Sequence, residues 1–491
     1  MALKATTHRL SKSNWFDYYS KGPRTTCTWV CLHLFFQLLF SGIAASHTIV
    51  TSLPGFSGDL PFTLETGYIS VGELDDVQLF YYFVQSQRSP AQDPLMMWLT
   101  GGPGCSGLAA LFYESGPLNF NYENYNGSAP TLSLNDYAWT QALNMIYIDA
   151  PVGTGFSYST TAEGYISNDS KTVAHLYQFL GKWLLDHTDF ASNNIYIGGE
   201  SYSGVTVPML VQEISDGIKA GHYPSMNIRG YVLVNPKTDS FIDNNERIPY
   251  AYGMSLISKE IYEATKESCN GDYVNTDSSS EDCLSDLAII EELLSEINLL
   301  QILEPSCSAI SLESRKTKGN RRFLREESKN VILSQPRSSA NWCRDYTYIP
   351  LGVWANEIAV QEALNVRNGT VEFWTKCNSS IEYTNDVTST IEYHRNLTST
   401  GLRALIFSGD HDLSIPSIAT QEWIASLNIT LEQSWRSWSN NGQTAGYTKK
   451  YSSGDFSLTY ATVKGAGHIA PEYKPEECYV MMDRWLAYYP L

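Results

Sequence analysis

The sequence predicts an α/β fold in which a mixed, mostly parallel central sheet is flanked by helices and interrupted by an inserted helical cap. Short apolar runs alternate with longer amphipathic segments through much of the chain, which is the pattern of a sheet covered on both faces. The alternation fails between about 239 and 345 and then resumes. With 43% apolar residues among 491, the chain can bury a large core. We therefore expect two core parts, 47–238 and 346–491, with the cap between them.

Residues 1–46 have the pattern of a secretory signal. A polar stretch with five basic side chains precedes the apolar run CTWVCLHLFFQLLFSGIAA, which ends in small residues. An uncleaved membrane anchor is the alternative. Export predicts oxidised cysteines, a vacuolar or extracellular destination and no membrane contact once the signal is removed. The net charge of −19 argues against nucleic-acid and anionic-membrane partners, because these attract clustered Lys and Arg.

The core elements follow from apolar runs and periodicity. The runs of strand length are 95–100, 145–150, 195–199, 230–235, 403–409 and 460–467. The amphipathic segments predict helices over 168–187, 203–217, 356–365, 418–427 and 475–489.

The cap, 239–345, lacks strand-like runs, and its stretch LAIIEELLSEINLLQIL has helical periodicity. Seven of the residues in 314–329 are Lys or Arg, so this stretch cannot pack and is expected to be a solvated loop. It is either a plain exposed loop or a spacer that proteases cut, which would leave two chains tied by disulfides.

The stretch IYIGGESYSG predicts a strand, a tight turn and a helix, with Ser201 at the turn. A serine before a helix is often an N-cap, which is the simpler interpretation. The preceding strand favours a nucleophile whose Oγ is exposed at the sheet edge, with the Tyr202 amide directed at the reacting carbonyl. Gly199 fills the first glycine of G-x-S-x-G, but Ser203 replaces the second and Gly204 comes one residue late.

A serine nucleophile needs a base, and the base needs an acid that orients it. In the order Ser, acid, His, the later stretches ALIFSGDHDLSIP and VKGAGHIAPEYKP supply Asp412 and His468 at strand ends. Asp410 follows the turn glycine and is expected to brace the loop. His411 lies beside its own acid and could hardly reach Ser201, and we expect His394 to be exposed.

The glycine-rich stretch WLTGGPGCSG follows the first strong strand and predicts an oxyanion hole. Two amides must face the developing negative charge, and Gly102 would supply the second beside Tyr202. An ordinary tight turn is the simpler interpretation. A phosphate-binding loop is excluded because no Lys-Ser/Thr pair follows.

These residues resemble the serine carboxypeptidase-like family of α/β-hydrolases, in particular its plant branch of acyltransferases that use glucose esters. The motifs LTGGPGCSG, APVGTGFSYS, GGESYSG, SGDHDLSIP and GAGHIAPEYKPEEC carry the resemblance over nearly the whole mature chain. It implies an α/β-hydrolase fold, the catalytic triad Ser201, Asp412 and His468, and oxyanion amides at Gly102 and Tyr202. The implied chemistry requires no metal, nucleotide or coenzyme A.

Seven cysteines follow the leader, which allows three bridges and one free thiol. The resemblance implies the bridges Cys105–Cys377, Cys269–Cys283 and Cys307–Cys343, with Cys478 unpaired. Six N-x-S/T sequons fit the export route and predict glycosylation at Asn126, Asn168, Asn368, Asn378, Asn396 and Asn428.

The resemblance also bears on the substrate. Carboxypeptidases of the family hold a free C-terminal carboxylate through a W-x-N-G-G loop and the Glu before the nucleophile, positions that correspond here to Trp98, Thr100, Gly101 and Glu200. Threonine, common in the transferase branch, reaches less far than asparagine and weakens this clamp. The stretches GDHD and APEYKP are also common in that branch.

Two positions depart from the transferase branch. Glu200 is the peptidase choice, whereas that branch often has Asp there. Val234 replaces the glycine that usually precedes the residue matching Asn235, a change beneath the acceptor pocket that leaves the acceptor unidentified. The expected function is acyl transfer from a small-molecule 1-O-glucose ester to an acceptor through a seryl acyl-enzyme. The alternatives are a serine carboxypeptidase acting at acid pH and a catalytically inactive binding protein on the same scaffold.

Overall fold

The computed structural model describes residues 47–122, 125, 127–222, 224–307 and 343–491. The expected signal, the basic stretch 314–329 and the sequon at Asn126 lie outside the described residues. Among the helices that are described, none is long and apolar enough to span a membrane.

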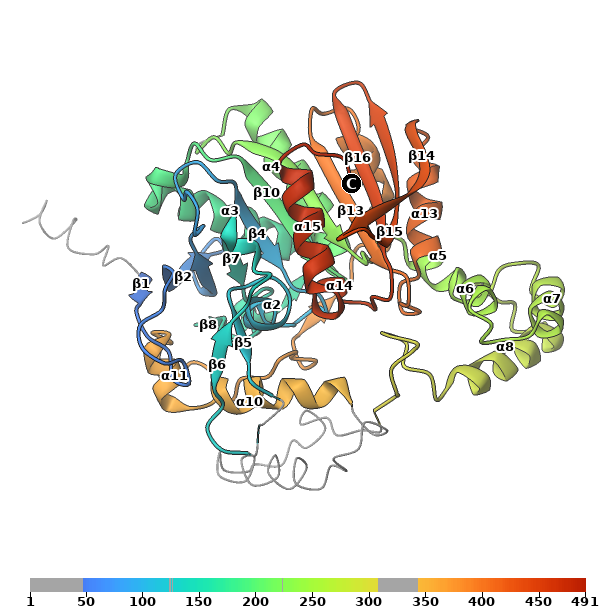
Figure 1. The fold of residues 1–491 in the computed structure, drawn as a ribbon, viewed down its shortest axis with the longest axis horizontal. Coiled ribbons are helices and arrows are strands. Elements are labelled where there is room, and N and C mark those ends of the chain that lie inside the picture. The colour runs from blue at the N-terminus through green and yellow to red at the C-terminus, as the bar shows by residue number, and fades with distance from the viewer. Residues whose placement is uncertain (1–46, 123–124, 126, 223, 308–342) are drawn as a thin grey trace, which may run out of the picture. The chain divides into compact units, whose positions relative to one another are not determined.

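A 12-stranded mixed sheet forms the centre of the described chain (Figure 1). Its path runs β1-β2-β3-β7-β4-β10-β11-β13-β16-β15-β14, and β8 pairs with β3. The strands are β1 (His47–Val50), β2 (Leu64–Val71), β3 (Val77–Val84), β4 (Leu95–Leu99), β7 (Asn144–Ile148), β8 (Tyr158–Ser159), β10 (Ile195–Glu200), β11 (Ile228–Val234), β13 (Arg403–Gly409), β14 (Thr430–Asn440), β15 (Gln443–Ser453) and β16 (Phe456–Val463). The short pairs β5–β6 (Leu118–Phe120 and Leu132–Leu134) and β9–β12 (Ser167–Asn168 and Tyr383–Thr384) lie outside this sheet.

The strands β7, β4, β10, β11, β13 and β16 are parallel and adjacent. They are the six strands expected from the apolar runs: β13 has the expected bounds, and the other five have shifted ends. The last run was placed too late, because β16 ends at Val463, before the turn that contains Gly465. The outer strands β1, β2, β3, β14 and β15 pair antiparallel and were not anticipated.

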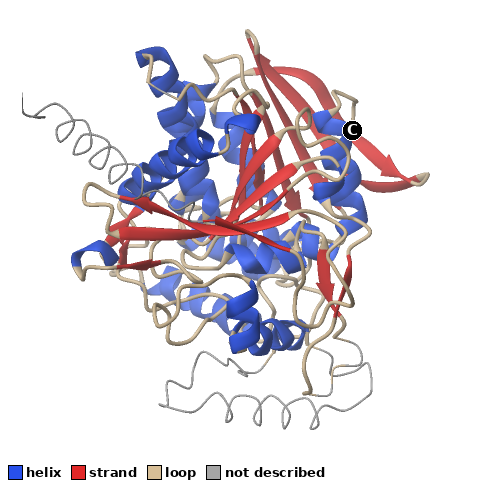
Figure 2. Cartoon of the chain, turned by 90° about the vertical axis from the view of Figure 1, so that its left-hand side faces the viewer, coloured by secondary structure: helices blue, strands red, loops and turns tan. Residues whose placement is uncertain are grey.

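Helices cover both faces of the sheet, as Figure 2 shows. Alternate side chains of a strand point to opposite faces. Met96 and Trp98 therefore pack in one buried apolar cluster, while Met97 and Leu99 pack in another. The first cluster contains residues of α2 (Gly107–Tyr113), α10 (Ile349–Ala355) and α15 (Pro475–Leu486), and the second contains residues of α3 (Asp169–Asp186), α4 (Ser203–Ala220) and α13 (Ser417–Ser426).

The expected helices are present with small shifts at their ends; the one expected over 356–365 is the shorter α11 (Ile358–Ala363). Helix α3 begins where Asn168 caps it, since the Asn168 Oδ1 accepts the Lys171 amide at 2.7 Å.

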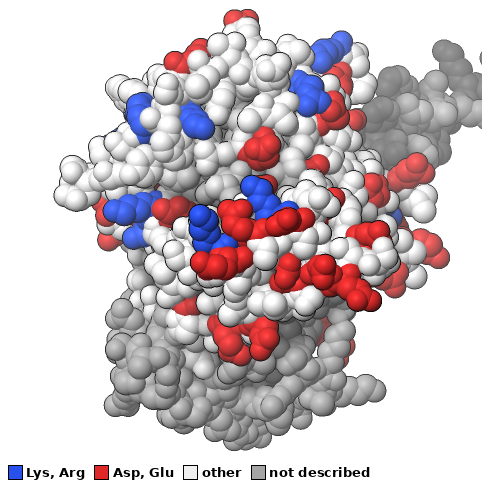
Figure 3. Space-filling model, turned by 90° about the vertical axis from the view of Figure 1, so that its right-hand side faces the viewer, with Lys and Arg blue, Asp and Glu red and all other residues white. Residues whose placement is uncertain are grey.

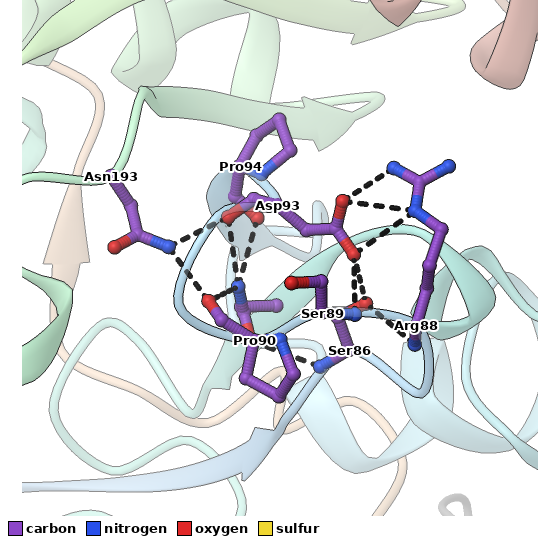
Figure 4. Close-up of polar contacts among 8 residues, drawn as sticks. Ser86, Arg88, Ser89, Pro90, Asp93, Pro94 and Asn193 are labelled. Carbon is purple, nitrogen blue, oxygen red and sulfur yellow. Dashed lines mark hydrogen bonds and ion pairs between the residues drawn. The ribbon is translucent and has the colours of Figure 1, made fainter.

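The strands β4 and β10 are held together at their beginnings by the loop around Asp93 (Figure 4). The Asp93 carboxylate accepts hydrogen bonds from Ser86, Arg88 and Ser89. The backbone carbonyl oxygen of Asp93 accepts a hydrogen bond from the Asn193 side-chain amide at 2.7 Å. This loop fixes the register of the two strands whose far ends carry the glycine-rich stretch and Ser201.

The connection between the adjacent parallel strands β11 and β13 spans residues 235–402. It contains α5 (Ser240–Asn245), α6 (Arg247–Gly253), α7 (Lys259–Ser268), α8 (Glu281–Leu294) and, after 342, α10, α11 and α12 (Ile391–Leu397). We call residues 239–307 the insert. In its described residues the insert is helical and adds no strand to the central sheet.

Acidic side chains lie on the face of the molecule that carries the insert helices (Figure 3). The exposed acids of α7 and α8 include Glu260, Glu263, Glu267, Glu281, Asp282, Glu291 and Glu292. This distribution agrees with the net charge of −19.

A buried ion pair ties the C-terminal end of α3 to β2. The His187 Nε2 lies 2.8 Å from Glu65 Oε1, which also accepts the Tyr81 hydroxyl at 2.6 Å. Burial alone would raise the pKa of Glu65, but hydrogen bonds from His187 and Tyr81 hold it below its usual range. Burial would lower the pKa of His187, but Glu65 raises it.

We expect the contribution of this pair to folding to be largest at mildly acid pH. Because its pKa is raised, His187 stabilises the fold below about pH 6.5, and this contribution is lost as the pH rises through the folded pKa. Because its pKa is lowered, Glu65 stabilises the fold above about pH 4.3, and this contribution is lost as the pH falls through the folded pKa. Urea unfolding of His187→Gln should show the largest destabilisation between these values. Exposed His222→Gln is the control. Equal destabilisation by His187→Gln at every pH would contradict this account.

Candidate active site

Ser201 lies at the tight turn between β10 and α4. Its backbone has φ +57, a left-handed conformation that residues other than glycine rarely adopt. Its amide donates to the Val234 carbonyl at 2.9 Å. The N-cap of α4 is Tyr202, with no side-chain cap bond, so the interpretation of Ser201 as a capping residue is wrong.

The altered glycine pattern at this turn has a steric explanation. A Cβ on Gly199 would lie 2.6 Å from Ser203 Cβ, so the turn tolerates only small residues at both positions. The Ser203 hydroxyl uses the space to donate to the Leu99 carbonyl at 3.0 Å. A Cβ on the late glycine, Gly204, would lie 2.3 Å from the Lys237 carbonyl oxygen, where the chain enters the insert.

The structure brings Ser201, His468 and Asp412 together. His468 Nε2 lies 2.7 Å from Ser201 Oγ, and His468 Nδ1 lies 2.7 Å from Asp412 Oδ2. Burial would lower the pKa of His468, but the charge and hydrogen bond of Asp412 raise it. In this arrangement one nitrogen of His468 can accept the Ser201 proton while Asp412 orients the ring through the other nitrogen.

Asp412 is fully buried and held by donors on both oxygens. The Ser414 amide donates to Oδ1 at 2.8 Å, and the Asn235 side-chain amide donates to Oδ2 at 2.8 Å. Asn235 also accepts the Gly409 amide at 3.0 Å, so one side chain joins the ends of β11 and β13. The preceding Val234 is buried among apolar residues of the sheet.

The rival histidines and acid have other roles. His411 Nδ1 lies 2.8 Å from Asp410 Oδ1, and Asp410 Oδ1 accepts the Gly465 amide at 2.7 Å, so this acid braces the loop. The expectation that His394 is exposed is wrong. It is fully buried, stacks on Trp423 and contacts the Tyr231 hydroxyl at 2.9 Å, because its position on α12 faces α4 and the sheet.

The glycine-rich loop contacts the nucleophile turn. A Cβ on Gly101 would lie 2.7 Å from Ser201 Cβ and 2.9 Å from the Tyr202 amide nitrogen, so this position excludes any side chain. Gly102 follows with φ +113, and its own amide is the next donor along the loop. This close approach places the loop beside the Tyr202 amide, as an oxyanion hole requires.

A buried acid pair lies beside these groups. Glu200 Oε1 accepts the Gly101 amide at 2.9 Å, and Glu114 Oε2 accepts the Trp98 indole at 2.8 Å. Burial, reinforced by the charge of Glu200, raises the pKa of Glu114 well above its usual range. Burial also raises the pKa of Glu200, although His468 and the Gly101 amide oppose this. Burial therefore favours the protonated form of both carboxyls.

Glu114 and Asn235 were not assigned to the site from the sequence. Asn235 was noted only as part of a motif. Glu114 directly follows the apolar helix α2, and an isolated acid next to a buried helix is a signal that could have identified it.

The three disulfides implied by the resemblance are present: Cys105–Cys377, Cys269–Cys283 and Cys307–Cys343. The first ties the glycine-rich loop to residues 376–378, where the Asn378 amide donates to the Gly104 carbonyl at 2.8 Å. Cys478 is free and buried, and burial raises the pKa of its thiol well above the usual range, which makes it unreactive.

The described sequons differ in accessibility. Asn368, Asn396 and Asn428 are exposed. Asn168 and Asn378 are half-buried, and the Asn378 Nδ2, the atom that would carry a glycan, donates to the Gly153 carbonyl at 2.9 Å.

Comparisons with known proteins agree with this geometry. The family model described as serine carboxypeptidase matches residues 54–488. Serine carboxypeptidase-like 7 of Arabidopsis thaliana is 44% identical, with 94% of this chain and 98% of that protein aligned. Serine carboxypeptidase-like 19 of the same plant is 43% identical, with 94% and 99% aligned.

Among solved structures, Kex1Δp, a prohormone-processing carboxypeptidase from Saccharomyces cerevisiae, aligns with a TM-score of 0.68. It shares 19% identity over 88% of this chain and 94% of that one, so it supports the fold alone. With the family model covering most of the chain and close relatives aligned nearly end to end, the chain belongs to the serine carboxypeptidase family of α/β-hydrolase enzymes.

Proposed function

We propose that this enzyme is an acyltransferase that moves an acyl group from a 1-O-glucose ester to the hydroxyl or amine of a small acceptor. The observation that carries the proposal is the state of Thr100. Its hydroxyl is buried and has no hydrogen-bond partner among the described residues. The threonine hydroxyl carries a single proton on a shorter side chain, so it reaches less far toward a substrate carboxylate than an asparagine NH₂ would.

The neighbouring donors of the expected carboxylate clamp are also engaged within the protein. The Trp98 indole donates to Glu114, and the Gly101 amide donates to Glu200. A site in which these donors already have acceptors is poorly suited to a free C-terminal carboxylate. An uncharged ester does not need these donors, so it can still bind next to the triad.

The chemistry proceeds in two steps through Ser201. The Ser201 Oγ attacks the ester carbonyl carbon while His468 Nε2 takes its proton, and the amides of Tyr202 and Gly102 hold the oxyanion. The bond to the anomeric oxygen of glucose breaks, and His468 gives that oxygen the proton. The acceptor then loses a proton to His468 and attacks the acyl-enzyme, and His468 returns the proton to Ser201.

Serine carboxypeptidase activity at acid pH is the second candidate, and the acid pair favours it. A protonated Glu200 or Glu114 can donate a hydrogen bond to a substrate carboxylate. The same protonated carboxyls could equally bond the hydroxyls of glucose, so the pair does not discriminate between the two substrates.

We further propose that the enzyme works in the vacuole or outside the cell, needs no cofactor and can exist as two chains. Three disulfides support an oxidising compartment. The Cys307–Cys343 bridge encloses residues 308–342, so a cut within 314–329 would leave the two pieces covalently joined. The exposed sequons are the proposed glycosylation sites.

The purified full chain, assayed at acid pH, should transfer acyl groups and leave a peptide intact. One arm contains a phenolic 1-O-glucose ester with mixed alcohol and amine acceptors, and the other contains an N-blocked dipeptide. We expect free glucose and acylated acceptor in equal amounts, read by mass spectrometry, and an intact dipeptide. Dipeptide cleavage without transfer would overturn the proposal.

The variant Thr100→Asn is the matched test of specificity. An amide at this position can donate to a carboxylate, and a hydrogen bond to a charged group corresponds to a gain of roughly tenfold or more in dipeptide cleavage. Unchanged dipeptide cleavage in Thr100→Asn would show that this position does not decide between the two activities.

A further inference from the structure

The loops that carry the catalytic acid and base are hydrogen-bonded to the same short stretch of the insert, residues 299–302, which we call the strap. The His468 amide donates to the Leu300 carbonyl at 2.8 Å. The amides of Leu413 and Ser414, the two residues after Asp412, donate to the Leu299 carbonyl at 2.9 Å each. The strap therefore bridges the two loops through the backbone.

Side chains reinforce this bridge. Gln301 is buried, and its amide donates to the Gly465 carbonyl at 3.2 Å, on the loop that leads to His468. A Cβ on Gly467 would lie 2.3 Å from the Leu300 carbonyl oxygen, so the strap and the base loop are in direct contact. The Ile302 amide donates to the His411 carbonyl at 3.1 Å, which adds a contact to the acid loop.

Helix α6 of the insert holds the acid loop from another side. The Arg247 Nε and Nη2 donate to the Ser414 carbonyl at 3.0 and 2.7 Å, and the Ser414 amide donates to Asp412. The Tyr250 hydroxyl donates to the Asp410 carbonyl at 2.7 Å. The Leu413 side chain packs in the apolar cluster formed by residues of the insert.

We propose that the insert positions the catalytic triad. The strap fixes the loops of Asp412 and His468 relative to each other. Arg247 is a positioning residue that holds the acid loop and offsets the negative charge of Asp412. The triad is thus assembled from both the sheet and the insert. This inference concerns Ser201 activation and holds for either acyl transfer or peptide cleavage.

The charges around His468 mean that loss of Arg247 should change the pKa of His468. Burial and the positive charge of Arg247 disfavour the imidazolium, whereas Asp412 and Glu200 favour it. The charge of Asp412 acts on three neighbouring groups, Arg247, Tyr250 and Tyr473. Removing the guanidinium should raise the pKa of His468, so a higher pH is needed to obtain the neutral base.

The test measures the rate at which a fluorophosphonate labels Ser201 as a function of pH in the full-length protein. In Arg247→Gln the acid limb of this profile should move to higher pH, and the maximal rate should fall by about tenfold to a hundredfold because the acid loop is less well held. In Arg247→Lys the limb should stay near its wild-type position, since the charge remains, while the maximum falls.

Two further variants separate positioning from general stability. Gln301→Met removes the contact to Gly465 at similar volume, so the maximal rate should fall without a movement of the limb. Arg395→Gln removes an exposed arginine of α12 and should change neither quantity. A soluble, cooperatively melting Arg247→Gln protein with a wild-type profile would overturn the proposal, as would an equal shift in Arg247→Lys. If Arg247→Gln does not fold, a wild-type profile in both Arg247→Lys and Gln301→Met would overturn it.

Discussion

Replacing Ser201 by alanine is expected to abolish acyl-enzyme formation and to lower turnover by on the order of 10⁶-fold. The Oγ is the atom that lies 2.7 Å from the base, and alanine provides no nucleophile at that position. The backbone of the turn is unchanged, so the variant should fold normally. Fluorophosphonate labelling and ester turnover should both be lost, while the melting temperature stays close to wild type.

The matched control is Ser203→Ala, two residues further along the same turn. Its hydroxyl donates to the Leu99 carbonyl and does not contact His468, so labelling should persist with at most a modest loss of stability. Labelling that survives in Ser201→Ala, or that disappears in a folded Ser203→Ala, would assign the nucleophile to a different residue.

The second large effect is expected from Asp412→Asn, with a fall in turnover of roughly 10⁴-fold. Both carboxylate oxygens accept backbone or side-chain amides, so an asparagine must turn its NH₂ toward a donor in either orientation. The His468 Nδ1 proton also loses its charged acceptor. The imidazole is then no longer held in the tautomer that leaves Nε2 free to accept the Ser201 proton.

Steady-state turnover of an activated ester checks this expectation, with Asp410→Asn as the control. Asp410 accepts the Gly465 amide and lies beside His411, but it does not touch the base, so its loss should cost far less than that of Asp412. Equal losses in the two variants would show that the loop as a whole, and not the acid at 412, supports catalysis.

The sequence predicted the central six strands because each is buried on both faces and reads as a continuous apolar run. It missed the flanking strands for different reasons. Strand β3 is buried along its whole length, but it directly follows another strand, β2, and so does not fit the alternation of strands and helices. Strand β14 is an exposed edge whose polar residues carry no apolar signal, and only pairing with β15 defines it.

The burial of His394 shows the same limit at the level of one side chain. Its neighbours in sequence are polar, but the helix α12 turns it toward Tyr231 and Trp423. Local composition describes the average exposure of a segment, whereas the face that a residue occupies depends on the element that packs against it.

By itself, the sequence determined which residues meet at the candidate active site: a serine at a strand-to-helix turn, an acid and a histidine after later strands, and glycines where a loop approaches the serine. These positions require particular atoms or the absence of a side chain, and such requirements are visible residue by residue. The tertiary structure alone decided that the charges of Glu114 and Glu200 interact, that Asn235 and Arg247 hold the acid loop, and that the strap joins both loops. These contacts join segments far apart in the chain, and their effects depend on burial and on the direction of each donor, which sequence spacing does not encode.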